Sequence, residues 1–277
     1  MTNVVVGAAS GMGAAVTRAL ARRGRLIAAD RDLDRLKRLT EEIDGDVVAV
    51  GCDVTDSAQV DALVAGIDEL GTIVVTAGIS TGSGAPGRRI FEVNLVGTAR
   101  VLAAVEPLLR PGVVGVCFSS ISAHRVPEHP PVMAALDDPL SANFFPALEA
   151  LGVDPDSPQF AYPMSKRGVL RLARRLAAPW GARGARILSV SPGINDTPMN
   201  RADEARNPIM AEFIRNSPLG RRGRPDEVAA VVAFLTSPAA SFMTGSDVLV
   251  DGGMVAAIPE DSTGGQGRHR EDTSTAS

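Results

Sequence analysis

The stretch MTNVVVGAASGMGAAV, residues 1–16, runs from the apolar segment Val4 to Val6 straight into glycines spaced G-x-x-x-G-x-G. The apolar segment is too short and too rich in β-branched side chains for a helix, whereas the alanine-rich stretch that follows has a helical pattern. The glycines are therefore expected at the turn between a strand and a helix. They are Gly7, Gly11 and Gly13.

Strand-like and helix-like segments alternate along the chain beyond this turn. Apolar strands that alternate with helices are typical of a parallel sheet covered by helices on both faces. The sequence therefore predicts an α/β protein with a single-domain Rossmann fold, a doubly wound parallel sheet with helices on both faces. The expected strands are residues 4–7, 25–30, 47–53, 72–78 and 113–120, and the expected helices are residues 12–23, 32–43, 57–68 and 88–109.

The composition suits one sizeable domain with a large core. The chain has 277 residues, of which 45% are hydrophobic, and a net charge of −4. Because it has no block of like charge and only 4% aromatic residues, we expect no nucleic-acid partner. With no long apolar run and no export signal, we expect no membrane contact and a cytoplasmic location. Cys52 and Cys117 are expected to be buried thiols, and His124, His129 and His269 lack metal-ligand spacing, so we expect no metal.

The glycine-rich turn can bind a diphosphate. Gly7 and Gly11 allow a ligand to approach closely, Gly13 lets the helix pack near the sheet, and the helix N-terminus offers free N–H groups to a pyrophosphate. The second strand ends in Asp30, whose carboxylate can bind the adenosine ribose hydroxyls and repel a 2′-phosphate. This pattern predicts NAD as the cofactor. The alternatives are a tight turn without a ligand, a helix cap for Asp30, and an Arg31 that pairs with the 2′-phosphate of NADP.

The segment AYPMSKRGVLRLARRLA carries Tyr162 and Lys166 within a helical pattern. Because positions i and i+4 lie on one helix face, the ammonium is within reach of the phenol and can lower its pKa. An isolated phenol with a pKa of about 10 is a poor base at pH 7. Beside an ammonium and the positive charge of an oxidised nicotinamide, it can serve as a proton shuttle. The spacing alone also arises by chance in many helices.

In combination these motifs resemble the short-chain dehydrogenase/reductase family, over residues 4 to 258. Their order and spacing are far more specific than any one motif. Within the family, the long interval before the Tyr-Lys pair and the ending PLGRRGRPDEVAAVVAFLTSPAASFMTGSDVLVDGGM look most similar to the bacterial 3α-hydroxysteroid dehydrogenase/carbonyl reductase branch. The matching residues are the three glycines, Asp30, Asp53, Val54, Ala77, Gly78, Asn94, Ser120, Tyr162, Lys166, Pro192, Gly193 and Thr197.

The resemblance implies catalytic roles for four residues. Tyr162 would be the general acid/base, and Lys166 would lower its pKa and hold the nicotinamide ribose. Ser120 would position the substrate oxygen, with Ser122 as the alternative, and Asn94 would anchor a water-linked proton path. The implied reaction moves a hydride between an alcohol carbon and the nicotinamide while the tyrosine moves the proton, so no metal is needed.

The resemblance also implies a cofactor site along the carboxyl ends of the strands. Asp53 and Val54 would flank the adenine, while Ile194 and Thr197 would bind the carboxamide end of the nicotinamide. The candidate cofactor-binding residues are Gly7, Ser10, Gly11, Met12, Gly13, Asp30, Arg31, Asp53, Val54, Ala77, Gly78, Tyr162, Lys166, Pro192, Gly193, Ile194 and Thr197.

Two segments depart from the family pattern. Val75 and Thr76 stand where the family has Asn-Asn, which concerns cofactor affinity more than reaction type. The interval from Ser120 to Tyr162 is unusually long and contains the amphipathic piece SANFFPALEAL, so we expect one or two short helices at about 123–158. In the family, the helix with the Tyr-Lys pair commonly packs against another subunit. We expect the insertion to cover that face and to favour a homodimer, with a tetramer as the alternative.

The C-terminal third is expected to contain a substrate loop and a tail. The loop spans about residues 198–219, and a disordered polar tail, 259–277, follows the NAD-binding domain of residues 1–258. Apolar side chains of the loop either line a pocket or form the core face of one helix. These side chains are Met199, Ile209, Met210 and Phe213.

The sequence therefore predicts an NAD-dependent oxidoreductase that interconverts a secondary alcohol and a ketone. The features of the hydroxysteroid branch suggest a bulky apolar small-molecule substrate, such as a hydroxysteroid. The spacing of Gly7, Gly11 and Gly13 disfavours the epimerases and dehydratases among the extended relatives. A non-catalytic NAD-binding sensor or interaction protein remains the alternative, which the intact Ser120 and Tyr162 disfavour.

Overall fold

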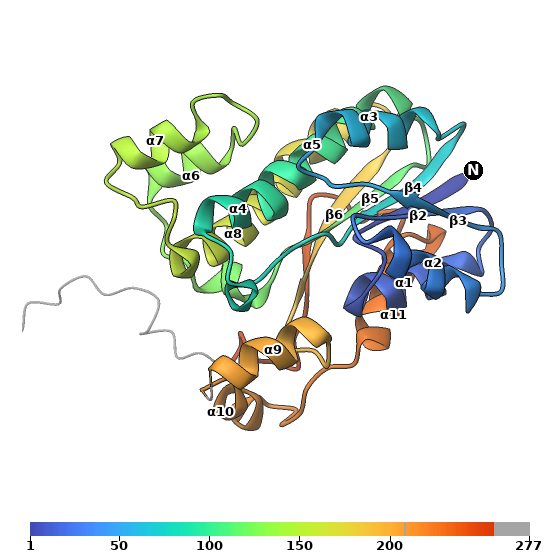
Figure 1. Cartoon of the computed structure of the whole chain (residues 1–277). Helices are drawn as coiled ribbons and strands as arrows, with labels where there is room; N and C mark the ends of the chain where they lie inside the picture. Colours follow the sequence, from blue (N-terminus) through green and yellow to red (C-terminus); the bar gives the residue numbers. More distant parts are fainter. Residues whose placement is uncertain (208, 258–277) are drawn as a thin grey trace, which may run out of the picture.

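A parallel β-sheet forms the centre of the protein (Figure 1). Its strands are β1 (Thr2–Val6), β2 (Leu26–Asp30), β3 (Val47–Gly51), β4 (Leu70–Val75), β5 (Val114–Phe118), β6 (Arg186–Pro192) and β7 (Asp247–Val250). The computed structural model describes residues 1–207 and 209–257. The strand order is β3-β2-β1-β4-β5-β6-β7, so the chain winds outward from β1 and then returns past it to start a second half at β4. This arrangement confirms the predicted doubly wound fold.

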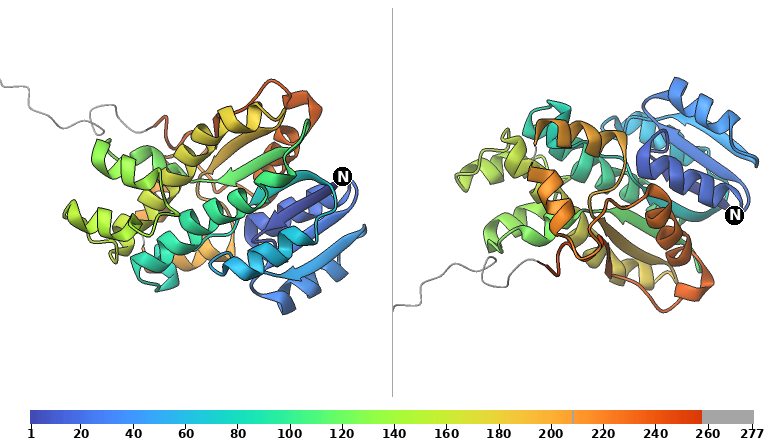
Figure 2. Two further views of the ribbon diagram at one scale, coloured as in Figure 1. Left: turned by 90° about the horizontal axis from the view of Figure 1, so that it is seen from above. Right: turned by 90° about the horizontal axis from the view of Figure 1, so that it is seen from below.

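Helices cover both faces of the sheet, and the two views of Figure 2 show these layers in turn. One face carries α1 (Gly11–Ala21), α2 (Leu33–Glu41) and α11 (Pro225–Leu235). The other carries α3 (Ser57–Ala65), α5 (Gly97–Ala104) and α8 (Pro158–Gly181), with α4 (Gly87–Phe91) packed on α8. In β1, Val4 and Val6 belong to one core and Val5 to the other, and all three are fully buried. A central strand between two cores must be apolar on both faces, which explains its continuous valine run.

The predicted helix at 88–109 is not one regular helix. It consists of α4, a π-helical turn (Glu92–Val96), α5 and a 3-10 turn (Glu106–Leu108). The π turn contains Asn94, whose side chain bonds to Ile79 rather than pointing along the helix surface. A π turn inserts one extra residue per turn and often marks a functional position.

The insertion contains two short helices, α6 (Pro130–Leu136), which packs on α8, and α7 (Phe144–Ala150), which packs on α6 (Figure 1). Arg171 of α8 donates to the carboxylate of Asp137, at the end of α6, at 2.8 and 2.6 Å. Phe144 and Leu148 are buried, so the insertion has its own apolar contacts. The expected substrate loop forms α9 (Pro198–Arg206) and α10 (Ile209–Asn216).

Three further expectations concern termini, membranes and thiols. The polar tail, 259–277, lies outside the described residues. Within residues 1–207 and 209–257, no helix is both long and apolar enough to cross a membrane. Cys52 and Cys117 are free and buried, as predicted, and burial raises the pKa of the two thiols to about 11 and about 12.

Candidate active site

Two adjoining cavities lie where the strands of the sheet end. The larger, about 860 Å³, is lined by residues that follow β4, β5 and β6 and by α9 and α10. The smaller, about 280 Å³, is lined by the glycine-rich turn and by residues that follow β2, β3 and β4. Met12, Gly78 and Thr197 line both cavities, so the two are continuous at these residues. A ligand crevice is expected here, because the chain reverses its winding between β1 and β4.

The glycine-rich turn has no room for side chains. Gly7 has a φ of +84°, and a Cβ there would lie 2.4 Å from the backbone nitrogen of Ala77. A Cβ on Gly13 would lie 1.9 Å from the carbonyl oxygen of Gly7. The Thr76 hydroxyl donates to the carbonyls of Val6 and Gly7, each at 2.9 Å. Thr76, which the sequence marked only as a departure from the family pattern, therefore braces the turn.

The smaller cavity has the donors and acceptors that a dinucleotide needs. The N-terminus of α1 opens onto it, and the side chain of its N-cap residue, Ser10, makes no capping hydrogen bond. Asp30 Oδ2 accepts from the backbone N–H of Ala9 at 2.9 Å, and Oδ1 accepts from that of Asp32 at 3.0 Å. These two bonds hold the carboxylate at the cavity, beside Arg31. Free helix N–H groups for a pyrophosphate and a fixed carboxylate for ribose hydroxyls fit a nicotinamide dinucleotide.

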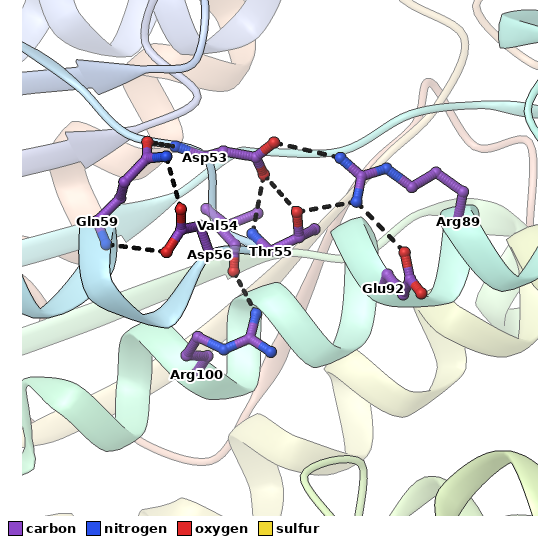
Figure 3. Close-up of polar contacts among 8 residues, drawn as sticks. All are labelled: Asp53, Val54, Thr55, Asp56, Gln59, Arg89, Glu92 and Arg100. Atoms are coloured by element: carbon purple, nitrogen blue, oxygen red, sulfur yellow. Dashed lines mark hydrogen bonds and ion pairs between the residues drawn. The ribbon is translucent and has the colours of Figure 1, made fainter.

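The predicted adenine residues Asp53 and Val54 line the same cavity, and Figure 3 shows how they are held. Asp53 Oδ1 accepts from the N–H and the hydroxyl of Thr55 at 2.9 and 2.8 Å, and Oδ2 accepts from Arg89 at 3.2 Å. Burial tends to raise the pKa of Asp53, but the Thr55 hydrogen bonds and the Arg89 charge outweigh it and keep the pKa low. Arg100 donates to the Val54 carbonyl at 2.5 Å. The loop is thus fixed from α4 and α5.

Three of the four predicted catalytic side chains, Ser120, Tyr162 and Lys166, line the larger cavity, and Asn94 does not. Ser120 follows β5, and its hydroxyl accepts from the N–H of Ser122 at 3.2 Å. Lys166, one turn along α8 from Tyr162, is buried and donates from Nζ to the carbonyl of Phe118 at 2.9 Å. The Ser122 hydroxyl also borders this cavity and has no hydrogen-bond partner among the described residues. Both serines thus border the cavity, and Ser120 is the one whose side chain acts to lower the pKa of Tyr162.

The pKa of Tyr162 departs from the sequence-based expectation. Burial is the main cause of a raised pKa, the negative charge of Asp203 adds to it, and the hydrogen bond with Ser120 partly offsets it. Burial likewise lowers the pKa of Lys166 to about 8. The sequence could show the i, i+4 spacing but not how deeply both groups lie.

Asn94 is fully buried and lines neither cavity, but it lies behind Gly78 and Ile79, which line both. Its Oδ1 accepts from the N–H of Ile79 at 2.8 Å, and its Nδ2 donates to the Ile79 carbonyl at 3.0 Å and to Ser165 Oγ at 3.2 Å. A Cβ on Gly78 would lie 3.2 Å from both Asn94 Oδ1 and Lys166 Nζ. The Asn94 amide and the Lys166 ammonium therefore both lie next to Gly78, which lines the cavity.

The segment after β6 completes the cofactor side. Pro192, Gly193 and Ile194 line the larger cavity, and Thr197 lines both. Thr197 caps α9 by accepting from the N–H of Asn200 at 3.2 Å. The predicted cofactor residues therefore lie around one crevice, and they line it from the ends of β1, β2, β3, β4 and β6.

The far side of the larger cavity is formed by α9 and α10. Met199, Met210 and Phe213 line it, which favours the pocket interpretation of the substrate loop over a core face; Met199 and Phe213 are 38% and 45% exposed. The side chain of Ile209 lies outside the described residues. Three charged lining residues, Arg125, Asp203 and Arg206, were not predicted from the sequence, because their sequence neighbours form no motif. Among the described residues, no cluster of three or more His, Cys, Asp or Glu side chains is arranged to hold a metal ion.

Comparisons with known proteins match most of the chain. The family model described as enoyl-(acyl carrier protein) reductase matches residues 7–138 and 149–255. Cis-4-hydroxycyclohexanecarboxylate dehydrogenase of Sinomonas cyclohexanicum is 33% identical, over 91% of this chain and 96% of the relative. The 3-alpha-hydroxysteroid dehydrogenase/carbonyl reductase of Comamonas testosteroni is 31% identical, over 92% and 96% of the two chains.

Solved structures give the same assignment. The 3-alpha-hydroxysteroid dehydrogenase from Pseudomonas sp. B-0831, complexed with NADH, has a TM-score of 0.75 at 30% identity and covers 92% of this chain and 97% of its own. A protein named BdcA, complexed with NADPH, has a TM-score of 0.71 at 26% identity and covers 91% and 93%. The chain therefore belongs to the short-chain dehydrogenase/reductase family.

Proposed function

We propose that this protein is an NAD-dependent dehydrogenase that interconverts a secondary alcohol and a ketone, with Tyr162 as the general acid/base. One observation carries the proposal: Ser120, Tyr162 and Lys166 line one cavity, which joins a second cavity shaped by the glycine-rich turn and Asp30. The first group of residues suits proton transfer, and the second suits a dinucleotide. A substrate between them would meet both.

The chain's own residues would handle the alcohol oxygen and its proton. Ser120 and Tyr162 would hold the oxygen between their hydroxyls, and the ionised phenol would take its proton as the carbon loses a hydride. When bound, the nicotinamide supplies the hydride acceptor and a positive charge beside the phenol. The buried ammonium of Lys166 would stabilise the phenolate, and Asn94 would hold a water that carries the proton onward. Because proton and hydride leave together, no isolated charge accumulates.

NAD is the proposed cofactor because of Asp30. Its carboxylate is held at the cavity by two backbone N–H groups, so it would bind both ribose hydroxyls and repel a 2′-phosphate. Arg31 lines the same cavity and could attract that phosphate instead. The relative activities with NAD and NADP test this choice directly.

The proposed substrate is bulky and largely apolar. The cavity of about 860 Å³ would hold the nicotinamide end of the cofactor as well as the substrate, and its volume falls within the range that holds drug-sized molecules. Two relatives are named for a hydroxysteroid and for a hydroxycyclohexanecarboxylate. A cyclic secondary alcohol with an apolar ring system fits both names and the methionine and phenylalanine lining.

We propose a cytoplasmic homodimer in which the insertion covers part of α8. The contacts of α6 with α8, including the Arg171–Asp137 pair, support this covering. A tetramer measured by light scattering would count against the dimer.

Reduction of NAD and NADP, followed at the nicotinamide absorbance, tests the function on hydroxysteroids, 4-hydroxycyclohexanecarboxylate and simple secondary alcohols. Tyr162→Phe should lower kcat about 1000-fold while NAD binding persists, because it removes only the acid/base hydroxyl. Ser120→Ala and Ser122→Ala form a matched pair, and the larger loss should follow Ser120→Ala. Unchanged turnover in Tyr162→Phe would overturn the mechanism. NAD binding without turnover on any substrate would favour the non-catalytic sensor.

A further inference from the structure

The larger cavity carries charges at two different places. Four charged side chains line it: Lys166, Asp203, Arg206 and Arg125. Asp203 lies near the reacting end: it accepts from the hydroxyl of Ser80, two residues beyond Gly78, where a Cβ would lie 3.2 Å from Lys166 Nζ. Its charge raises the pKa of Tyr162. Arg125 ends η4 (Ile121–Arg125), the 3-10 helix that starts directly after Ser120. A 3-10 helix rises about 2.0 Å per residue, so the backbone of Arg125 lies within about 10 Å of that of Ser120.

Three of these four groups already have partners within the protein. Lys166 donates to the Phe118 carbonyl at 2.9 Å. Asp203 accepts from the Ser80 hydroxyl at 2.8 Å, and Arg206 donates to the carbonyl of Gly82. The last two contacts join α9 to the 3-10 turn η1 (Thr81–Ser83), so they have a structural role at the edge of the cavity.

Arg125 is different. Within residues 1–207 and 209–257 it has neither a hydrogen bond nor an ion pair, and its guanidinium lies over the ring of Phe213, 5.0 Å from the centroid. The nearby acids are paired with other bases, Glu128 with Arg167 and Asp247 with His124. The Phe213 ring restrains the guanidinium from one face and leaves its N–H edges available to a ligand.

We propose that Arg125 binds a carboxylate of the substrate, so that the enzyme acts on amphipathic hydroxy acids or oxo acids rather than on neutral alcohols. This inference rests on the proposed dehydrogenase function and specifies its substrate class. A guanidinium binds a carboxylate through two parallel N–H···O bonds. The carboxylate of Asp203 repels a second anion from the reacting end, so the acid group is directed to Arg125 and the alcohol to Tyr162.

The test compares acids with their methyl esters, which keep the shape and lose the charge. Wild type should favour 4-hydroxycyclohexanecarboxylate, or a hydroxysteroid acid, over its methyl ester in kcat/KM. Arg125→Met should lower kcat/KM for the acid about 10- to 100-fold, mainly through KM, because it removes charge-assisted hydrogen bonds. In the same variant, kcat/KM for the ester should change less than about 3-fold. Arg125→Lys should restore part of the preference for the acid, since lysine keeps the charge without the planar guanidinium.

Arg215→Met is the matched control. Arg215 is exposed on α10 and is not among the residues that line the cavity, so the variant has the same charge change without altering the acid-to-ester ratio. If the acid-to-ester ratio of kcat/KM is unchanged in Arg125→Met while turnover persists, Arg125 does not bind the substrate carboxylate, and the dehydrogenase function still stands. If neither acid nor ester is turned over, the proposed function fails. Calorimetry of acid binding then tests by itself whether Arg125 binds the carboxylate. Binding of the acid to wild type but not to Arg125→Met would support it, and equal binding would reject it.

Discussion

The cofactor half and the substrate half of the site are formed by different kinds of structural element. The cofactor half consists of backbone at the ends of parallel strands, where a Cβ on Gly13 would overlap the Gly7 carbonyl and two N–H groups fix Asp30. The substrate half consists of η4, α9 and α10, which lie outside the sheet, and it includes exposed side chains such as Phe213. The sheet thus presents a preformed cofactor site, while the added helices allow the substrate pocket to vary among relatives.

If the cofactor half is as tightly packed as this comparison holds, Gly13→Ala should have the largest effect. The new methyl group would lie 1.9 Å from the Gly7 carbonyl and 2.7 Å from the Thr76 hydroxyl. We expect the free energy of unfolding to fall by about 1–3 kcal/mol and NAD binding to be lost. Denaturant unfolding and NAD titration measure the two effects.

Gly181→Ala is the control, because a Cβ there would meet nothing within 4 Å at the end of α8. It should be neutral or slightly stabilising, since alanine favours the helix. Full NAD binding by Gly13→Ala would show that the turn can relax and that the two halves do not differ in rigidity.

A smaller effect is expected from Asp30→Asn, which sharpens the cofactor half. The amide keeps one acceptor for the backbone N–H groups but loses the charge that repels a 2′-phosphate. We expect the KM for NAD to rise about 10-fold and the KM for NADP to fall, in line with the loss of one charge-assisted hydrogen bond. Initial rates with both cofactors measure this.

Asp32→Asn is the matched control two residues away. Asp32 caps α2 by accepting from the N–H of Arg35 at 3.0 Å, and asparagine caps nearly as well. Cofactor choice should therefore stay unchanged in this variant. Equal use of NADP by wild type would instead assign the dominant role to Arg31.

The two halves also differ in how much the sequence could predict. The glycines, Asp30 and the apolar strands are local patterns, and they predicted the doubly wound sheet and the crevice at its carboxyl ends. Asp203 could not be found in this way, because its partner Ser80 lies 123 positions away and no periodicity links them.

Burial and helix irregularity were also invisible in the sequence. The predicted fall in the pKa of Tyr162 neglected its burial, which raises the pKa. The π turn around Asn94 follows from side-chain bonds to Ile79, 15 positions away, rather than from helix propensity. Contacts between distant segments therefore account for what the local patterns missed.

The smallest effect is expected from Asp203→Asn, which tests whether the substrate half tunes the chemistry. The amide oxygen can still accept the Ser80 hydroxyl, so the contact between α9 and η1 should persist while the charge disappears. Asp203 raises the pKa of Tyr162, so its neutralisation should lower that pKa. Because the phenol acts as a base only when ionised, alcohol oxidation rises as pH passes through this pKa.

The rising limb of kcat/KM should therefore move to lower pH in Asp203→Asn, by about half a unit for one partly screened charge. Glu204→Gln is the control on the same helix, since Glu204 pairs with Arg222 and does not line the cavity. A shift in both variants would indicate a general effect of net charge or of a loosened α9. A shift in Asp203→Asn alone would show that a helix outside the sheet adjusts the proton transfer as well as the substrate fit, and no shift would confine that helix to binding.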